Sequence, residues 1–472
     1  MEGLDWHEWG KAAFLRAKKE KKPVLLSVSA RWCHWCHTMD RLTYGNEQIA
    51  FFINKSFIPV RVDTDERPDV NERYNVGGWP TTAILAHDGE IVSAATYVPP
   101  QHAVKFLEDG ISRFKKYKPK KSKFRVQKPL PFDSEQFYLS VKSFYDPVNG
   151  GFGLEPKFPH PDILEFLVWR LLKHRDADAK RMLDNSCLKM FESELFDSAG
   201  GGFFRYATER NWTIPHFEKM LEDNARLLST YVYAYRLFNR EEYLTAINKT
   251  LFFLFTVLYD HEKGVFYGSQ DADEEYCKLP FEKRLDKEHP FVDKTIYTDW
   301  NASAALAFFE ASNIDVEYEK VALRLLESLY KLNVRGLVAH YYPAEKPLYL
   351  LKDHVYLLAA LIHAFKRTNK LEWKAKALSV AKALEKFYDK KNGGFFDVLA
   401  KDAVGRLKER KKPVHENAFA ALVLRLLSIV ADDKKYAKMA EKTLTAVSSQ
   451  AVILGPYAAT YAVAHGELHG NH

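Results

Sequence analysis

The sequence predicts an α/β domain at the N-terminus followed by a larger all-α domain. Apolar runs typical of strands alternate with helical segments near the N-terminus, and strand signals nearly vanish from Phe132 onward. Beyond that residue, loops that combine glycine with an aromatic residue recur between long segments of helical periodicity. With 472 residues, the chain is long enough for two or more domains that each bury a core of their own.

Composition and charge indicate a globular protein. Hydrophobic residues make up 47% of the chain and charged residues 28%, which is far from the composition of disordered proteins. The net charge of +7 is spread along the chain apart from a basic run between Lys115 and Lys128, so nucleic-acid binding is not indicated. No apolar stretch reaches the roughly 18 residues of a membrane helix, and the first residues lack the apolar core of a signal peptide. We therefore expect a cytoplasmic protein that binds neither nucleic acid nor membranes.

The elements of the α/β part can be placed from their apolar patterns and from one turn signal. The Asp88-Gly89 pair between two apolar runs is typical of a β-hairpin. In chain order, we expect a helix over residues 6–20, a strand at Val24–Ser29, a helix from the cysteine motif through Asn54, strands at 57–63, 81–86 and 91–97, and a helix over 101–117.

The rest of the chain predicts a linker and a domain of helical hairpins. We expect an α/β domain over residues 1–117, a basic, proline-containing linker over 118–131, and a helical domain over 132–472. Such hairpins can close into an (α/α) toroid with polar helix starts at one mouth, and an open helical solenoid is the alternative. The recurring loops end at Phe152, Phe203, Phe266 and Phe395, and related helix starts follow at Glu222, Thr298, Lys352 and His415.

The segment Cys33-His34-Trp35-Cys36 is the main candidate for chemistry in the α/β part. It follows an expected strand and precedes an expected helix, so Cys33 should lie at a helix N-terminus, where a thiolate is stabilised. Cys33 is then the attacking thiol and Cys36 the resolving thiol. His34 either stabilises the thiolate or is an exposed imidazole with little effect. Cys187 and Cys277 stand alone in helical segments, where a cysteine is usually a small buried apolar residue.

Other interpretations of this segment stay open. With His37, it matches the C-x-x-C-H pattern of c-type haem attachment, which normally follows export. A subset of its cysteines and histidines could also bind Zn²⁺, although four neighbours on one helical turn cannot all converge on a tetrahedral ion. We expect no cofactor and no metal. Trp32 and Trp35 flank the pair, either as an apolar platform for a substrate or as packing residues.

Several motifs carry a resemblance to a known family. The chain contains CHWCH, VDTDERPDV, GGWP, PKFPHP, HFEKMLEDNA and QDADEE, and together they resemble the DUF255 family of thioredoxin-like proteins, which includes the spermatogenesis-associated protein 20 group. The resemblance implies a thioredoxin-like fold and a six-hairpin toroid like those of glycoside hydrolases and sugar 2-epimerases. It also implies that Pro80 is the cis-proline that faces the cysteines. The chain departs from thioredoxins at Ser27, where they carry a buried acidic proton acceptor, and in a shorter segment before GGWP.

The helical domain contains a second set of candidates. If a helix begins near Pro215, His216 lies in its opening turn, and Met220 and Asp223 recur on the same side. Carboxylates and imidazoles at a toroid mouth could perform acid–base chemistry on a sugar that stacks on aromatic rings. Helix N-caps and first-turn charges are the alternative role for such residues. The candidates are His216, Glu218, Asp223, Asp271, Asp273, His354 and His415.

These observations lead to three functional hypotheses. The first is a thiol–disulfide oxidoreductase that uses Cys33, Cys36, Pro80 and His34 on a protein client, with the toroid binding the client or a small ligand. The second is a carbohydrate-active enzyme, a sugar epimerase or a glycoside hydrolase, centred on the toroid. The third is a scaffold without catalysis that holds a ligand in the toroid mouth.

Overall fold

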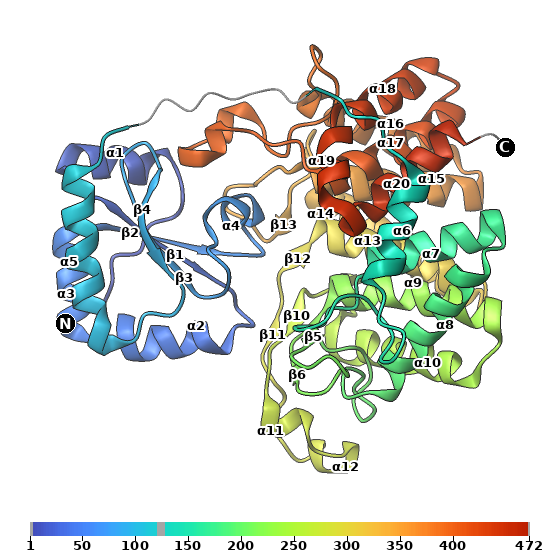
Figure 1. The fold of residues 1–472 in the computed structure, drawn as a ribbon, viewed down its shortest axis with the longest axis horizontal. Helices are drawn as coiled ribbons and strands as arrows, with labels where there is room; N and C mark the ends of the chain where they lie inside the picture. The colour runs from blue at the N-terminus through green and yellow to red at the C-terminus, as the bar shows by residue number, and fades with distance from the viewer. Residues whose placement is uncertain (1–2, 120–127, 471–472) are drawn as a thin grey trace. The chain divides into compact units, whose positions relative to one another are not determined.

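The chain folds into two compact units. The structure is a computed structural model that describes residues 3–119 and 128–470, as Figure 1 shows. Unit 1 combines the chain up to Val126 with Val398–Lys411, and unit 2 consists of Gln127–Asp397 and Lys412–His472. Most of the expected linker, residues 120–127, lies outside the described residues. The segment Val398–Lys411, which we expected in the helical domain, packs with unit 1 instead.

Unit 1 is built on a mixed sheet with the strand order β2-β1-β3-β4. β1 is parallel to β2 and antiparallel to β3, and β3 forms a hairpin with β4. Helices α3 and α5 cover one face of this sheet through a core that includes Leu25, Ile53 and Leu107. The elements are α1 Lys11–Glu20, β1 Val24–Ser29, α2 His34–Met39, a π-helical turn Asp40–Tyr44, α3 Glu47–Ser56, β2 Ile58–Asp63, α4 Pro68–Tyr74, β3 Thr81–Leu85, β4 Ile91–Ala95 and α5 Pro100–Lys116.

Two expected helices differ in extent for local reasons. The first helix begins at Lys11 because the preceding residues pair with β2, where His7 N donates to Pro59 O at 2.9 Å. The helix expected from the cysteine motif through Asn54 is divided, because the Asn46 side chain accepts hydrogen bonds from Gln48 N and Ile49 N and starts a new helix.

Unit 2 is an (α/α) toroid. Within its described residues, six inner helices form a closed ring in which each packs against the next and α20 returns to α7. The ring closure excludes the open solenoid. The inner helices are α7 Pro161–His174, α9 Leu221–Phe238, α13 Thr298–Ala311, α15 Leu351–Thr368, α17 Val414–Ala431 and α20 Ala459–His469; the outer helices are α6 Ser134–Phe144, α8 Ala177–Glu192, α10 Glu241–Phe253, α14 Glu317–Asn333, α16 Leu371–Leu384 and α18 Lys434–Ala446.

The inner helices are apolar because neighbours cover them on both sides. In α13, nearly every residue from Thr298 to Ala311 is buried. Contrary to the expectation that no stretch has the length and apolarity of a membrane helix, one helix in the part of the chain that the structure describes, α17, meets both criteria. It packs against α15, α18 and α20, so its position in the ring accounts for its composition.

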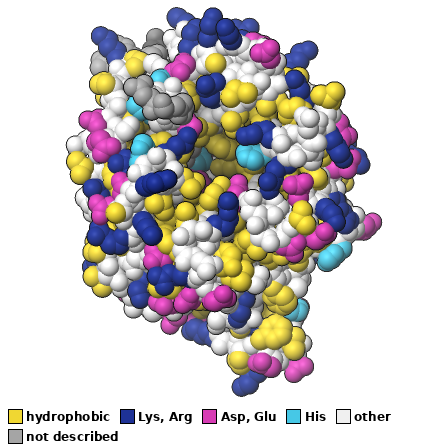
Figure 2. Space-filling view, turned by 90° about the vertical axis from the view of Figure 1, so that its right-hand side faces the viewer, with side chains coloured by type: hydrophobic (Ala, Val, Ile, Leu, Met, Phe, Trp, Pro, Cys, Tyr) yellow, Lys and Arg dark blue, Asp and Glu magenta, His cyan; other side chains and the backbone are white. Residues whose placement is uncertain are grey.

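Long loops connect each outer helix to the following inner helix. They carry the short strands β5 Tyr206–Ala207, β6 Pro215–His216, β7 Lys219–Met220, β8 Tyr259–Asp260, β9 Val265–Phe266, β10 Ser269–Gln270, β11 Val292–Asp293, β12 Ile296–Tyr297 and β13 Tyr341–Tyr342, with the short helices α11 Glu274–Cys277, α12 Phe281–Arg284 and α19 Ser448–Leu454. Helices α11 and α12 project from the rest of unit 2 in Figure 1. Figure 2 shows a hollow with a largely apolar floor on one face of the molecule.

The recurring glycine-aromatic loops share one conformation. In each, an aspartate accepts hydrogen bonds from the backbone N–H groups two and three residues later, as Asp146 does from Val148 and Asn149. The phenylalanine six residues after the aspartate then forms an antiparallel bridge with the residue just before the aspartate. The loops run from Asp146 to Phe152, Asp197 to Phe203, Asp260 to Phe266 and Asp389 to Phe395.

Three of these loops are each bound by an asparagine in the first turn of the inner helix that follows. Asn224 Oδ1 accepts from Phe203 N at 2.7 Å, and its Nδ2 donates to Phe203 O at 3.0 Å and to Met220 O at 2.9 Å. Asn301 and Asn417 bind Phe266 and Phe395 in the same way. The repeated sequence pattern is therefore a repeated loop-to-helix contact.

Replacing one of these asparagines should destabilise unit 2. Asn224→Ala leaves a buried backbone N–H and C=O of Phe203 without partners, which should cost about 3 kcal/mol of unfolding free energy. Urea denaturation followed by circular dichroism measures this loss. Asn313→Ala is the matched control, because Asn313 is exposed and bonds only within its own turn. Equal stability of the two variants would contradict the structural role of Asn224.

Candidate functional sites

The cysteine pair lies at the start of α2 and forms a disulfide. Cys33 is the N-cap residue of α2, and its Sγ accepts a hydrogen bond from Cys36 N at 3.2 Å. The two sulfurs are bonded to each other, with the Cα atoms 5.2 Å apart. Cys33 is 6% exposed and Cys36 is 3% exposed. The helix N-terminus therefore supports a thiolate on Cys33 when the pair is reduced.

The loop that follows β2 holds the segment before Cys33. Arg31 N donates to Asp63 Oδ2 at 3.0 Å, and Trp32 Nε1 donates to Asp65 Oδ2 at 2.6 Å. Burial, reinforced by the nearby charge of Asp65, raises the pKa of Asp63 to about 8. Trp32 is thus a packing residue, whereas Trp35 is 56% exposed and available to a substrate beside the exposed His34.

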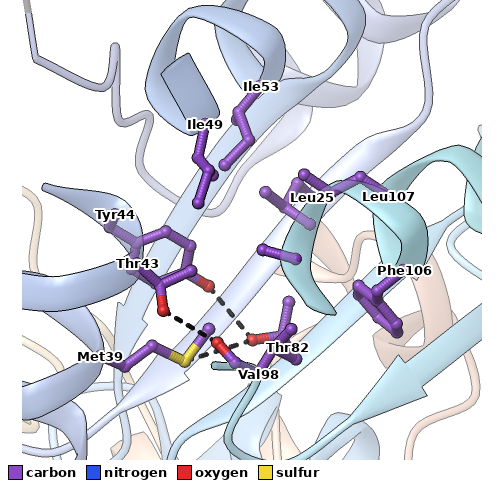
Figure 3. A pocket seen from close by; sticks show the side chains of 11 residues that line it. Leu25, Met39, Thr43, Tyr44, Ile49, Ile53, Thr82, Val98, Phe106 and Leu107 are labelled. Carbon is purple, nitrogen blue, oxygen red and sulfur yellow. Dashed lines mark hydrogen bonds between the residues drawn. The ribbon is translucent and has the colours of Figure 1, made fainter. Parts of the chain in front are cut away.

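A small cavity lies between the sheet and the helices α3 and α5 and is shown in Figure 3. Its volume is about 10 Å³, and among the described residues that line it none carries a carboxylate. Tyr44 Oη and Thr82 Oγ1 are 3.1 Å apart there, and burial raises the pKa of Tyr44. With Ser27 buried on β1 as well, this part of the core contains neutral hydroxyls in place of an acidic proton acceptor.

The loop before β3 contains Pro80. The Trp79–Pro80 peptide bond is cis, and the rings of Trp79 and Trp32 are in edge-to-face contact with their centroids 5.5 Å apart. Asn75 Oδ1 accepts from Gly77 N and Gly78 N, at 2.8 and 2.9 Å, which shapes the turn that leads into this bond.

The toroid presents a ring of polar side chains at the starts of its inner helices. The second residue of every inner helix belongs to this set, which we call the mouth ring. Lys352 Nζ lies 2.8 Å from Asp299 Oδ2, and His415 Nδ1 lies 3.4 Å from Asp162 Oδ1 and 2.9 Å from Thr460 Oγ1. The members are Asp162, Glu222, Asp299, Lys352, His415 and Thr460.

The mouth ring is surrounded by protein and yet accessible to solvent. The side chains of Asp162 and His415 are 33% and 32% exposed. A second layer lies one turn further along the helices, where Arg226 forms ion pairs with Asp162 and Glu165. Tyr356 in that layer is hydrogen-bonded to His415 Nε2 at 3.0 Å. These groups therefore form a partly exposed polar cluster at the helix starts.

Glu222 is the unpaired carboxylate of the mouth ring. Among the described residues it makes no hydrogen bond or ion pair. Burial, with the nearby charge of Asp299, raises its pKa to about 7 even though Lys352 acts in the opposite direction. Burial also opposes ionisation of Asp162, but the charges of Arg226 and His415 outweigh it and lower the pKa of that carboxyl. The two acids should therefore be in different protonation states near neutral pH.

A buried cluster adjoins Lys352. His340 Nδ1 lies 2.9 Å from Asp353 Oδ1 and 3.9 Å from Asp299 Oδ1. In the described part of the chain, these three residues are the one group whose side chains could converge on a metal ion. The Lys352 ammonium already neutralises Asp299, and the carboxylates raise the pKa of Lys352 against the effect of burial. The cluster is thus a buried network of ion pairs, in which Asp299 Oδ1 has no hydrogen-bond partner among the described residues.

The predicted helix near Pro215 is wrong. Residues 215–216 form β6, which pairs with β5, and α9 begins at Leu221. The backbone of this segment forms hydrogen bonds with the neighbouring strand segment instead of within a helix, since Arg205 N donates to Glu218 O at 3.0 Å. His216 therefore does not share a helix side with Met220 and Asp223.

His216 and Glu218 instead belong to a hairpin in the loop before α9. The His216 ring stacks on Tyr206 with the centroids 4.2 Å apart, and Tyr206 stacks on Phe158 at 4.5 Å. His216 Nδ1 lies 3.7 Å from Glu218 Oε1. Glu218 is buried, and in the described part of the chain its Oε2 has no hydrogen-bond partner.

The remaining candidates have different environments. Asp273 caps α11 by accepting from Tyr276 N at 2.9 Å, and Asp271 Oδ1 accepts from Ala272 N. His354 binds a loop as the asparagines do, since its Nε2 accepts from Val338 N at 3.1 Å; burial lowers its pKa to about 4. Asp223 follows the mouth-ring residue of α9, and burial raises its pKa. Of the predicted toroid residues, His415 is the one in the mouth ring.

The sequence contains a signal for the members that were missed. The segments Glu222-Asp-Asn, Asp299-Trp-Asn, Lys352-Asp-His and His415-Glu-Asn align at the loop-binding third position. Because that position is fixed by the loop, the first position of each segment must occupy an equivalent place in the ring.

Comparisons with known proteins agree with both units. Residues 1–123 match the model of the family Thioredox_DsbH, described as a protein of unknown function, DUF255. This segment of the chain is similar to the DUF255 family. Spermatogenesis-associated protein 20 of Rattus norvegicus is 34% identical over 314 residues, which cover 57% of this chain and 39% of the relative. The chain thus spans about two fifths of the length of this relative.

The toroid is similar to sugar-acting proteins. Cellobiose 2-epimerase of Bacteroides fragilis is 29% identical over 160 residues, which cover 34% of this chain and 38% of that protein. The structure of cellobiose 2-epimerase from Bacillus thermoamylovorans matches with a TM-score of 0.56 at 11% identity, covering 71% of this chain and 98% of that one. At this identity the structural match shows the fold alone. The DUF255 segment therefore precedes a six-hairpin toroid.

Glu222 should make the stability of unit 2 depend on pH. Its pKa is about 7 in the folded chain against an ordinary 4.5, so the folded state binds the proton more tightly and the free energy of unfolding falls as pH rises from about 4.5 to 7. Glu222→Gln should remove this loss, so the stability of the variant relative to the wild type should increase by about 2–3 kcal/mol from pH 5 to pH 8. Urea denaturation at both pH values tests it, with the exposed Glu372→Gln as control. The same difference at both pH values would contradict the shift.

Proposed function

We propose that unit 1 is a thiol–disulfide oxidoreductase. Reduced Cys33 attacks one sulfur of a client disulfide as a thiolate and releases the other client sulfur as a thiolate. Cys36 then attacks Cys33 Sγ, forms the Cys33–Cys36 disulfide and releases the second client thiol, so two electrons pass to the client. The observation that carries the proposal is the disulfide between Cys33 and Cys36 at the N-terminus of α2.

Neighbouring residues support this direction of attack. The N-cap position of Cys33 stabilises its thiolate, whereas Cys36 lies in the helix and is more buried. The cis Trp79–Pro80 bond and the exposed Trp35 provide backbone and an apolar surface for an extended client segment.

A cysteine series tests the redox proposal. Cys36→Ser should accumulate mixed disulfides with clients, because the resolving thiol is gone, and Cys33→Ser should lower insulin reduction by at least about 100-fold. Mass spectrometry of trapped adducts and an insulin-turbidity assay measure these effects. Cys187→Ser should match the wild type, because Cys187 is buried and burial raises the pKa of its thiol. Activity of Cys33→Ser equal to the wild type would overturn the proposal.

A second candidate function is that the toroid is a carbohydrate-active enzyme, either a sugar epimerase or a glycoside hydrolase. The mouth ring favours it: Glu222 has a pKa near neutrality, as a proton-transfer group requires, and His415 lies in a hydrogen-bonded chain with Tyr356. The stack of His216 on Tyr206 offers ring faces to a sugar. The partial match to a protein named cellobiose 2-epimerase supports the same class of substrate.

A panel of neutral mono- and disaccharides separates the two functions. Glu222→Gln should lower kcat for a turned-over sugar by about 100-fold or more, because it cannot transfer a proton, and His216→Ala should mainly raise KM. Cys33→Ser should leave sugar turnover unchanged. Nuclear magnetic resonance of the sugar measures conversion. Binding of a sugar without turnover would favour the scaffold hypothesis over this candidate.

A further inference from the structure

Residues 398–411 form a segment of unit 1 that we call the strap. It leaves unit 2 after Asp397 and returns to it at Lys412. Within the strap, Val404 and Leu407 are buried, and the backbone makes short 3-10 turns at Ala400–Asp402 and Gly405–Lys408. The strap is therefore packed as part of the unit that contains the cysteine pair.

Tyr74 is the main attachment point of the strap. Its Oη donates to Gly89 O at 2.9 Å and accepts from Arg406 N at 2.8 Å, and the side chain is fully buried. The Arg406 guanidinium also pairs with Glu90 at 2.9 Å and donates to Arg73 O at 3.3 Å. One phenol thus joins the end of α4, the turn between β3 and β4, and the strap.

Two glycines bring the strap backbone against that turn. Gly89 and Gly405 have φ values of 91° and 59°, which disfavour a side chain. A Cβ on Gly89 would overlap Gly405 Cα, and a Cβ on Gly405 would lie 2.5 Å from Tyr74 Oη. The strap can therefore dock only while both positions lack a side chain.

The helix that Tyr74 ends also holds the Pro80 loop. Asn71 Oδ1 accepts from Asn75 Nδ2 at 3.0 Å and from Trp79 Nε1 at 3.1 Å. Asn75 in turn fixes the backbone that leads into the Trp79–Pro80 bond. The hydrogen bonds from Arg406 to Tyr74 and those from Asn71 and Asn75 to the loop at Pro80 are therefore joined through the backbone of the last turn of α4.

We propose that the strap is a positioning element of the redox site, which holds α4 and through it the Pro80 loop in the geometry that receives a protein client. The inference rests on the proposed oxidoreductase function. Because the strap acts on the client-binding loop and makes no hydrogen bond to the cysteines in the described residues, it should affect client binding more than thiol chemistry.

The test uses full-length variants. In Gly405→Ala and Arg406→Ala, KM for insulin should rise at least about fivefold, while reduction of a small aromatic disulfide stays within about twofold of the wild type. Hydrogen–deuterium exchange of residues 75–80 should become about tenfold faster. Gly336→Ala is the control for backbone strain, because Gly336 has a φ of 76° and a Cβ added there would have no atoms within 4 Å. Lys408→Ala is the control within the strap, because Lys408 is exposed.

Each outcome decides the inference. Equal losses for insulin and the small disulfide would overturn it, because they indicate general destabilisation of unit 1. Unchanged exchange at residues 75–80 would overturn it as well. If the wild type reduces neither substrate, the oxidoreductase proposal fails, and faster exchange at 75–80 in Gly405→Ala but not in Gly336→Ala still supports the positioning role.

Discussion

The docking of three glycine-phenylalanine loops onto the inner helices that follow them is the contact on which unit 2 depends. Asn224 makes three backbone hydrogen bonds, two to Phe203 and one to Met220, so one side chain fixes the loop and the helix start together. This fixes the rotation of the helix about its axis. A residue two positions earlier points about 200° away from the asparagine, which is the opposite side of the helix. Glu222 must therefore lie on the side of α9 away from the loop, near Lys352 and Asp299 of the mouth ring.

The same helix starts explain the charges of the mouth ring. First-turn positions favour carboxylates, because the unpaired N–H groups and the helix dipole stabilise negative charge. Lys352 is unfavourable at such a position by itself, and it is compensated by Asp299 at 2.8 Å. Arg226 neutralises Asp162, which leaves Glu222 as the acid of the mouth ring without a direct partner among the described residues. The helix starts thus explain why the mouth ring contains carboxylates. The carboxylate that lacks an ion-pair partner among the described residues, Glu222, is the one suited to proton transfer.

The sequence predicts the architecture more accurately than it predicts the residues of the toroid site. The bounds of the strand Val24–Ser29 are predicted correctly because four of its six residues are apolar, whereas the repeats predict helical hairpins and only the packing of α20 on α7 distinguishes a closed toroid from a solenoid. His216 was misplaced because Pro215 is typical of a helix start, while the pairing that makes residues 215–216 a strand comes from Tyr206 and Ala207. His354 was read as a site candidate because a histidine that replaces a loop-binding asparagine is recognisable only once the loops are aligned in space.

The strap could not be assigned from sequence for a related reason. Its composition is that of an ordinary connection between α16 and α17, and its packing depends on Tyr74 and Gly89, which are more than 300 residues away in the chain. Because both ends of the strap are covalently joined to the rest of the chain, its docking is intramolecular, with an effective concentration of the order of millimolar. Individual hydrogen bonds contribute only about 0.5–1.5 kcal/mol each. A few of them, with the buried Leu407, are then sufficient to keep the strap docked without a large apolar interface.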